Sequence, residues 1–277
     1  MSPIVVGLLL TAAVLHATWN AILRSGSDRL WSITIMAAVG ALVALPFALG
    51  LPKPDAASWP YLALSASLQV GYSLFLVRAY RDGHLAHVYP IARGTAPLLV
   101  TLGAAVFAGE RLGAPAAAGV ALVSGGIMIL GLGRDRPDLR STAAALAAGA
   151  FIASYMVTDG VGVRASEHAA GYAAWQAVAQ GATLPLVYWA IRGRPPGVPR
   201  GWPGARVIAA AVMGVFGYCV VIWAMSRSPM GQVSALRETS ILFAALIGAV
   251  FLREPVTARR LLGGAVIASG AICLSAF

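Results

Sequence analysis

Two arginines stand inside otherwise apolar stretches of the chain, and their chemistry is the first feature that needs an explanation. Arg93 and Arg237 each lie several residues from the nearest end of such a stretch. In a membrane helix a central charge costs at least about 2.5–3.5 kcal/mol, so a charge that persists usually faces an interior cavity or a partner. A guanidinium offers a fork that matches a carboxylate. We therefore predict that either arginine binds a substrate carboxylate; the alternative is internal pairing or an outward reach to the headgroups.

Glu238 follows Arg237 directly, and it is the only acid that we expect well inside a span. Adjacent residues on a helix point about 100° apart, so these two are not expected to pair with each other. Glu238 is predicted to meet a substrate ammonium group or to carry a coupling proton. The alternative is a structural ion pair.

A polar cluster of His16, Trp19 and Asn20 lies in the first apolar stretch, where His16 and Asn20 share one helix face. Rings with a hydrogen-bonding tip, and amides, suit a pocket that holds an amphipathic molecule and releases it. Tryptophan and tyrosine are also expected at the membrane interfaces. The rest of the predicted lining is Gln69, Tyr72, Tyr89, Tyr155, Trp175, Gln176, Gln180, Tyr218 and Trp223.

Two prolines interrupt the fourth apolar stretch, at Pro90 and Pro97. Proline removes a backbone donor and disfavours a straight helix. The ninth stretch has no proline, so we expect the fourth span to be bent or unwound, as a gate or a packing kink, and the ninth to be regular.

These residues belong to a unit that the chain contains twice. Residues 93–130 and 237–274, aligned without gaps, share 13 of 38 residues. The shared pairs include Arg93/Arg237, Thr95/Thr239, Glu110/Glu254, Gly119/Gly263 and Gly126/Gly270. Self-similarity on this scale indicates a duplicated architecture.

Composition places both copies in a membrane. The chain has 59% hydrophobic and only 11% charged residues, with a mean hydropathy of +0.79, whereas soluble domains carry about 25% charge. Runs of about 18–24 apolar residues are long enough to cross roughly 30 Å of hydrocarbon. Ten are expected, near residues 3–23, 30–50, 57–78, 86–109, 114–132, 141–158, 169–191, 205–226, 231–252 and 260–277.

Ten spans divide into five and five, in halves 1–136 and 137–277 joined by the polar link GRDRPDLR. Because each half has an odd number of spans, the second enters from the opposite face. The sequence thus predicts an all-α membrane protein with ten transmembrane helices, as two inverted five-helix repeats around a central cavity. Inverted repeats are typical of secondary transporters, which bind a small molecule near the midplane.

Other classes of function lack their signatures. Cys219 and Cys273 lie in apolar stretches, and the four histidines are scattered, so neither a disulfide framework nor a metal site is expected. No GxxxxGK[ST] loop and no HExxH motif occurs. The net charge of +10 resides mostly in loops, which argues against nucleic-acid binding. We predict no cofactor, no metal and no enzymatic activity.

Orientation follows from the distribution of basic residues, because cytoplasmic loops carry the excess. The loops that join odd to even spans hold Arg24, Arg29, Arg78, Arg81, Arg134, Arg136, Arg140, Arg192, Arg194, Arg200, Arg206, Arg253, Arg259 and Arg260. The other loops hold only Lys53, Arg111, Arg164 and Arg227. Both termini are therefore predicted to be extracytoplasmic.

Small residues recur at four-residue spacing in the fifth and tenth stretches, as in Ala117, Ala121 and Gly125, and in Gly264 and Ala268. Such spacing lets helices approach closely. We expect packing within one monomer, with a dimer interface as the alternative.

The segments LHATWNAILR, YPIARGTAP, FAGERL and LREPVTARRLLGGAVIASGAICL carry a resemblance to a known family. They resemble the EamA-type transporters of the drug/metabolite transporter superfamily, and within it the bacterial exporters of aromatic and other neutral amino acids. The resemblance implies a bacterial inner-membrane location and a cavity built from the first, third, fourth, sixth, eighth and ninth spans.

Two other substrate classes within that superfamily remain as alternatives. Multidrug antiporters related to it use a glutamate in the first helix, and this sequence has no acid there. Carriers of phosphate esters or nucleotide sugars need several converging cations, and the only lysine, Lys53, lies in a loop. Neutral amino acids remain the expected substrates.

Overall fold

The computed structural model describes residues 1–23, 29–82, 85–131, 139–194, 197, 201–251 and 257–276, and within these ranges it has helices and no strand. The helices are α1 (Pro3–Leu23), α2 (Arg29–Gly50), α3 (Trp59–Asp82), α4 (Leu85–Ala108), α5 (Ala114–Gly131), α6 (Leu139–Ala165), α7 (Ala169–Arg192), α8 (Trp202–Met225), α9 (Met230–Glu238), α10 (Ser240–Phe251) and α11 (Ala258–Ala276). A short 3₁₀ turn, η1 (Ala56–Ser58), precedes α3. The predicted boundary between the halves, at residues 136 and 137, lies outside the described ranges.

The helices match the ten predicted spans, with α9 and α10 sharing the ninth. Among the described residues, eight spans are long and apolar enough to cross a membrane by themselves, and α3 and α7 are not. Those two carry the amides Gln69 and Gln176, which are buried inside the bundle. The lower apolarity of α3 and α7 therefore reflects polar groups that face the protein interior.

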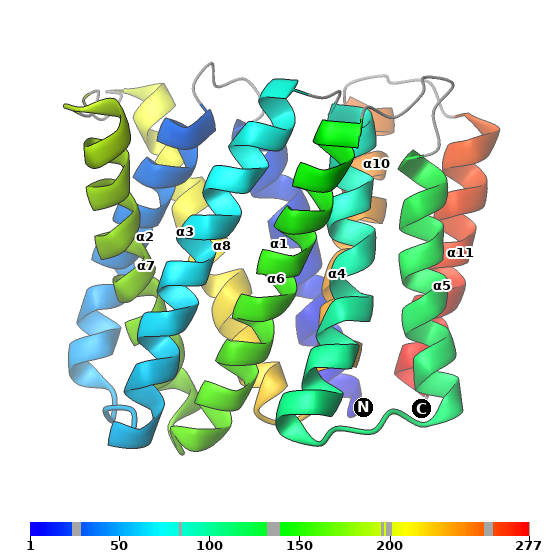
Figure 1. The fold of residues 1–277 in the computed structure, drawn as a ribbon, viewed down its shortest axis with the longest axis horizontal. Helices are drawn as coiled ribbons and strands as arrows, with labels where there is room; N and C mark the ends of the chain where they lie inside the picture. Colours follow the sequence, from blue (N-terminus) through cyan, green and yellow to red (C-terminus); the bar gives the residue numbers. More distant parts are fainter. Residues whose placement is uncertain are drawn as a thin grey trace.

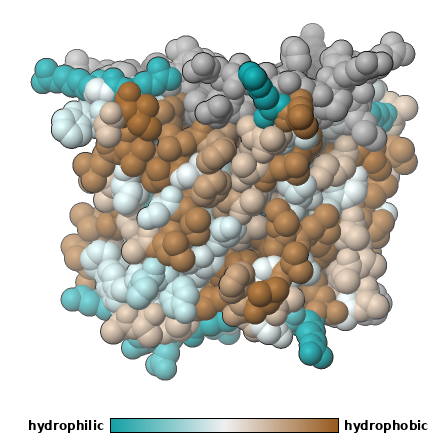
Figure 2. All heavy atoms as spheres, viewed as in Figure 1, coloured by the Kyte–Doolittle hydropathy of each residue, from teal (hydrophilic) through white to brown (hydrophobic). Residues whose placement is uncertain are grey.

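The outer surface is suited to lipid. Large apolar side chains such as Leu42, Leu102, Phe107, Leu261 and Ile272 are exposed on the outside of the helices. In Figure 2 brown and tan residues dominate the broad middle of the face, and teal residues gather at its upper and lower edges. This banding is what a bilayer-spanning protein requires, because charged groups are stable only at the two water-facing ends.

The two halves are related by inversion. Helix α3 packs against α6 and α7, and its repeat-related counterpart α8 packs against α1 and α2. In the same way α4 contacts α6, whereas α9 and α10 contact α1. The pairs α2–α7 and α5–α11 join equivalent helices of the two halves and lie at opposite ends of the bundle in Figure 1, with both termini at one face. The predicted inverted five-helix repeats are confirmed.

Repeat-related glycines hold α5 and α11 together. A Cβ on Gly126 would lie 2.9 Å from the Gly263 carbonyl oxygen, and one on Gly119 would lie 3.1 Å from the Gly270 oxygen. The reverse contacts are equally close. Only glycine permits two backbones to approach so closely. These contacts join the two halves of one chain.

The predicted set of small residues is nevertheless on the wrong face of the fifth helix. Ala117, Ala121 and Gly125 are exposed, and nothing lies within 4 Å of a Cβ added to Gly125. The buried stripe is displaced by about one residue, which on a helix is a rotation of about 100°. Apolar composition alone does not distinguish these faces, because lipid and protein accept the same small residues.

The helix interruption lies in the ninth span, which we expected to be regular, and the fourth span is not unwound. Helix α4 continues through Pro90 and Pro97, and the ninth span is the one that is interrupted, at Thr239. The Thr239 amide and its hydroxyl both donate to the carbonyl of Leu236, at 3.1 and 2.6 Å, which tightens this turn. In α4 the hydroxyl of Thr101 donates to the Pro97 carbonyl at 2.8 Å, one of the local contacts by which a membrane helix accommodates proline.

Candidate binding site

A cavity of about 720 Å³ lies in the bundle, bounded by both halves. Its walls come from α1, α3, α4, α6, α8 and the α9–α10 span, as the resemblance implies, and also from α2 and α7. The lining extends from Tyr155 and Tyr218 in the middle of their helices to Ser32 and Arg260 near helix starts. The cavity therefore approaches the face opposite the termini.

Nine of the predicted binding residues line this cavity, and Pro90 lines it too. They are His16, Trp19, Asn20, Tyr72, Tyr89, Arg93, Tyr155, Tyr218 and Arg237. Gln69 and Gln180, also expected in the lining, are there as well. The sequence analysis thus identified side chains that are far apart in the chain, and the fold brings them together around one cavity.

Five predicted residues lie away from the wall of this cavity, and one of them, Trp223, lines a smaller cavity instead. Trp175 packs edge-on against Trp59, with ring centroids 5.2 Å apart, and Gln176 donates to the Ser65 hydroxyl at 3.0 Å. Pro97 is buried within the helix packing. Glu238 is completely buried behind Arg93.

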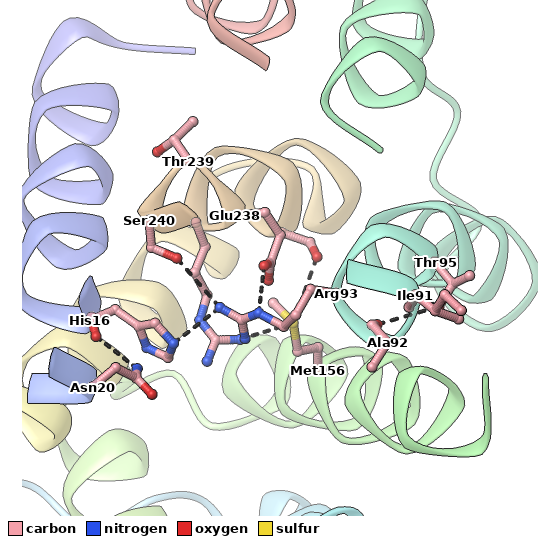
Figure 3. A network of polar contacts seen from close by, with 12 residues as sticks. His16, Asn20, Ile91, Ala92, Arg93, Thr95, Met156, Glu238, Thr239 and Ser240 are labelled. Atoms are coloured by element: carbon pink, nitrogen blue, oxygen red, sulfur yellow. Dashed lines mark hydrogen bonds and ion pairs between the residues drawn. The ribbon is translucent and has the colours of Figure 1, made fainter. Parts of the chain in front are cut away.

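Arg93 is held in place by residues of both halves, as Figure 3 shows. Its Nε lies 2.7 Å from Oε2 of Glu238, and the side chains are 3% and 0% exposed. Neither carboxylate oxygen has a directed hydrogen bond within the described part of the chain, so this contact is an ion pair rather than a fork. The ion pair neutralises the Arg93 charge inside the bundle.

His16 and Ser240 complete the surroundings of Arg93. The Nη2 atom lies 3.0 Å from Nε2 of His16 and donates to the Ser240 hydroxyl at 3.4 Å. Because a guanidinium cannot accept a hydrogen bond, Nε2 of His16 must be the acceptor, and its ring proton lies on Nδ1. Asn20 donates to the His16 carbonyl at 2.8 Å and is thus tied to its own helix.

Arg237 has a different environment. Its guanidinium carbon lies 5.6 Å from the centre of the Tyr218 ring, and Nη1 contacts the Met156 sulfur at 3.6 Å. Among the described residues no carboxylate pairs with it. The arginine is only 8% exposed, yet it lines the cavity. Arg237 is therefore a cation of the cavity wall that no carboxylate of the described residues contacts directly.

Tyrosines form the wall beside this cation. The ring centroids of Tyr72 and Tyr155 are 6.0 Å apart, and those of Tyr155 and Tyr218 are 6.2 Å apart, both edge to face. This arrangement is the preferred geometry for aromatic pairs and leaves ring surface for an incoming apolar group.

Asp159 is a buried acid that the sequence reasoning missed. It lies on α6 and is 0% exposed, so the expectation that Glu238 is the only acid well inside a span is wrong. Asp159 accepts hydrogen bonds from Tyr172, at 3.1 Å, and from Tyr218. The predicted sixth span ended one residue before Asp159, because the glycines and charges that follow it resemble a loop. The helix continues to Ala165.

A second missed cluster lies at the face that carries the termini. Arg164, expected in a loop, ends α6 and pairs with Glu110. The other Glu110 oxygen accepts the amide of Met230 at 2.9 Å, at the start of α9. Arg164 also donates to the carbonyls of Met225 and Ser228, both at 3.0 Å. We call these contacts the Glu110–Arg164 latch.

Within the described ranges, no group of three or more potential metal ligands is present. A smaller cavity of about 480 Å³ lies at the face of the termini, lined by residues that include Met1, Arg227 and Gln232. Gln232, which lines this smaller cavity, and Arg237, which lines the larger one, are both on α9.

Comparisons with known proteins bear on this arrangement. The model of the EamA-like transporter family matches residues 140–276. No curated protein matches the chain. One solved structure, described only as "Crystal structure of protein", superposes with a TM-score of 0.80 at 21% identity, over 100% of this chain and 98% of that one. The likeness to the solved structure shows the fold of the whole chain.

Proposed function

Because its residues 140–276 form an EamA-like transporter domain, the chain is a membrane transporter of the drug/metabolite transporter superfamily, and we propose that it exports neutral amino acids, chiefly aromatic ones. The proposal rests on one observation. Arg237 presents to the cavity a guanidinium that no carboxylate of the described residues contacts, and the adjoining wall is made of tyrosines.

The charge of the cavity selects among substrate classes. A buried cation without a partner is costly, and a substrate carboxylate relieves that cost through charge-assisted hydrogen bonds. Lipophilic cations are disfavoured, because they would add positive charge beside Arg237. Phosphate esters need more than one available cation, and Arg93 is already neutralised by Glu238. A single carboxylate is the matching group.

The size and surface of the cavity fit the rest of an amino acid. Ligand pockets usually measure about 300–1,000 Å³, and this one is within that range at about 720 Å³. The rings of Tyr72, Tyr155 and Tyr218 offer an aromatic side chain edge-to-face contacts worth about 0.5–1.5 kcal/mol each. A substrate with an apolar side chain but no ring would lose only these edge-to-face contacts and would keep the contact of its carboxylate with Arg237.

The two faces support transport by alternating access. The cavity approaches the face opposite the termini, and the Glu110–Arg164 latch lies at the other face. In the proposed orientation, in a bacterial inner membrane with both termini outside, the cavity loads from the cytoplasm. Several of the arginines on which the predicted orientation depends, such as Arg24, Arg134 and Arg253, lie outside the described residues. Opening of the latch would then expose the cavity to the outside.

Counterflow in proteoliposomes tests the proposal. Purified protein is reconstituted with unlabelled phenylalanine inside, and uptake of labelled phenylalanine is measured against a panel of competitors. Neutral amino acids with large side chains should compete, and phenylethylamine, which lacks the carboxylate, should compete poorly. Liposomes without protein give the background. Phenylethylamine competing as well as phenylalanine, or no exchange of any amino acid, would refute the proposal.

A further inference from the structure

We propose that Asp159 is a proton-binding site of the transport cycle, and that the substrate ammonium group displaces its proton by way of Tyr218. The inference rests on the proposed function, because it requires a substrate with both a carboxylate and an ammonium group. It makes the protein a proton-coupled exporter.

The surroundings of Asp159 are polar but neutral. Oδ1 accepts the hydroxyl of Tyr172 on α7, at 3.1 Å, and Oδ2 accepts the hydroxyl of Tyr218 on α8. Ser65 on α3 lies near the carboxyl group. Each of these donors is uncharged, so the protein supplies hydrogen bonds without a compensating cation.

The role of Ser65 as a donor follows from its other contacts. Its oxygen accepts amide N–H groups from Gln176, at 3.0 Å, and from Gln69, at 3.3 Å. With its lone pairs used in this way, the serine hydroxyl has its proton to give to Asp159. Gln69 lines the cavity, so its hydrogen bond to Ser65 links the cavity wall to the surroundings of Asp159.

No cation among the described residues contacts the Asp159 carboxylate. The titratable groups around it are Tyr172 and Tyr218, with Tyr61 of α3 beside Tyr172, and Tyr155 one turn earlier on α6. Arg237 of α9 approaches only the ring of Tyr218. A carboxylate in this setting is costly to keep charged, and the usual relief is a bound proton.

Tyr218 connects Asp159 to the proposed substrate. Its hydroxyl donates to the carboxylate, its ring lines the cavity, and the Arg237 guanidinium carbon lies 5.6 Å from the ring centre. A substrate whose carboxylate binds Arg237 carries its ammonium group on the same α-carbon. That ammonium group must therefore lie in the neighbourhood of Tyr218.

The proton on Asp159 and the substrate ammonium group can replace each other, because each compensates the negative charge of the carboxylate. With the cavity empty, Asp159 holds a proton. An ammonium group near Tyr218 stabilises the charged carboxylate, because an opposite charge within about 4–6 Å favours the ionised form. Asp159 then gives its proton to the Tyr218 oxygen as the Tyr218 hydroxyl proton passes to water in the cavity. When the substrate leaves on the other side, a proton from that side returns to Asp159. One substrate moves outward as one proton moves inward.

The test is proton release on substrate binding. Purified protein in detergent, in weakly buffered solution with a pH-indicating dye, is mixed with phenylalanine at neutral pH. The wild-type protein should release up to about one proton per molecule, because a single carboxyl group is exchanged. Asp159→Asn, which cannot ionise, should release none. Asp55→Asn, which alters an exposed acid next to η1, is the matched control and should behave as the wild type.

A second variant keeps the inference testable if Asp159→Asn does not fold. Tyr218→Phe removes a hydroxyl that stabilises the charged carboxylate and should release fewer protons at the same pH. Proteoliposomes provide an independent measurement: with the exterior alkaline relative to the interior, or the reverse, wild-type protein should accumulate phenylalanine several-fold on the acidic side.

The results that would refute the role of Asp159 differ from those that would refute the proposed function. Counterflow of phenylalanine by wild-type protein, with no proton release and no response to a pH gradient, would overturn the coupling role of Asp159 alone. Undiminished release in Asp159→Asn would do the same. Absence of amino-acid counterflow would overturn the proposed function and this inference with it.

Discussion

Replacing Arg237 by lysine probes the feature on which the proposed substrate class depends. Lysine keeps the positive charge but has no planar fork, so it cannot bind both carboxylate oxygens in the way that a guanidinium does. Arg237 lines the cavity, and within the described residues it has no carboxylate partner of its own. The substitution therefore mainly affects the contact between residue 237 and the substrate carboxylate.

The expected magnitude follows from the contact that is lost. A hydrogen bond to a charged group contributes about 1.5–3 kcal/mol. Loss of one such bond weakens apparent affinity about ten- to a hundredfold, since each 1.4 kcal/mol is a factor of ten. The effect should apply to phenylalanine and not to phenylethylamine, which has no carboxylate to lose.

Arg93→Lys is the matched control. Arg93 is the repeat-related arginine and also borders the cavity, but Glu238 already pairs with it. This change should lower thermal stability and reduce transport of both compounds to a similar extent. The comparison isolates the carboxylate contact from the general effect of shortening a buried arginine.

The assay is half-saturation of counterflow for phenylalanine and phenylethylamine in both variants, with folded protein confirmed by gel filtration. Equal losses for both compounds in Arg237→Lys would refute the carboxylate-anchor reasoning. A selective loss in Arg93→Lys would show instead that the ion pair with Glu238 opens when substrate binds.

Further predictions concern stability, gating and topology. Glu238→Gln leaves its buried arginine partner uncompensated and should cost roughly 3–5 kcal/mol, seen as a large fall in melting temperature; an unchanged value would contradict the ion pair. Gly126→Ala places a Cβ 2.9 Å from a backbone oxygen and should destabilise by about 1–3 kcal/mol, whereas Gly125→Ala, with open space around it, should not; equal melting temperatures would refute this packing. Glu110→Gln weakens the latch and should speed labelling of Gln232→Cys by an impermeant maleimide from the face of the termini; slower labelling would contradict it. A green fluorescent protein fused to the C-terminus should stay dark, because both termini are proposed to be extracytoplasmic, and bright cytoplasmic fluorescence would reverse the orientation.

The architecture could be predicted from the sequence because its causes are local or repeated. Long apolar runs specify membrane helices, and the duplicated unit that begins at Arg93 and at Arg237 specifies two related halves. An odd number of spans in each half then requires inversion. Most of the polar and aromatic side chains of the cavity wall could be predicted as well, because polar groups in apolar helices must face an interior.

Tertiary structure decided which charges compensate each other. The sequence placed Glu238 beside Arg237, and the fold pairs it with Arg93 of the other half. Distance along the chain carries no information about this choice, because it depends on how two inverted helices meet at the centre. The same pairing made Arg237, and not Arg93, the available cation.

Asp159 and the interruption at Thr239 show the limits of reading by composition. Glycines and a charge near the end of an apolar run resemble a loop, yet hydroxyls from α7 and α8 accommodate Asp159 inside α6. Proline suggested a break in α4, but the helix interruption came from a threonine that bonds its own backbone. Local sequence determines where helices are stable in a membrane. The contacts between helices determine which polar groups are satisfied, and therefore which remain available to a substrate.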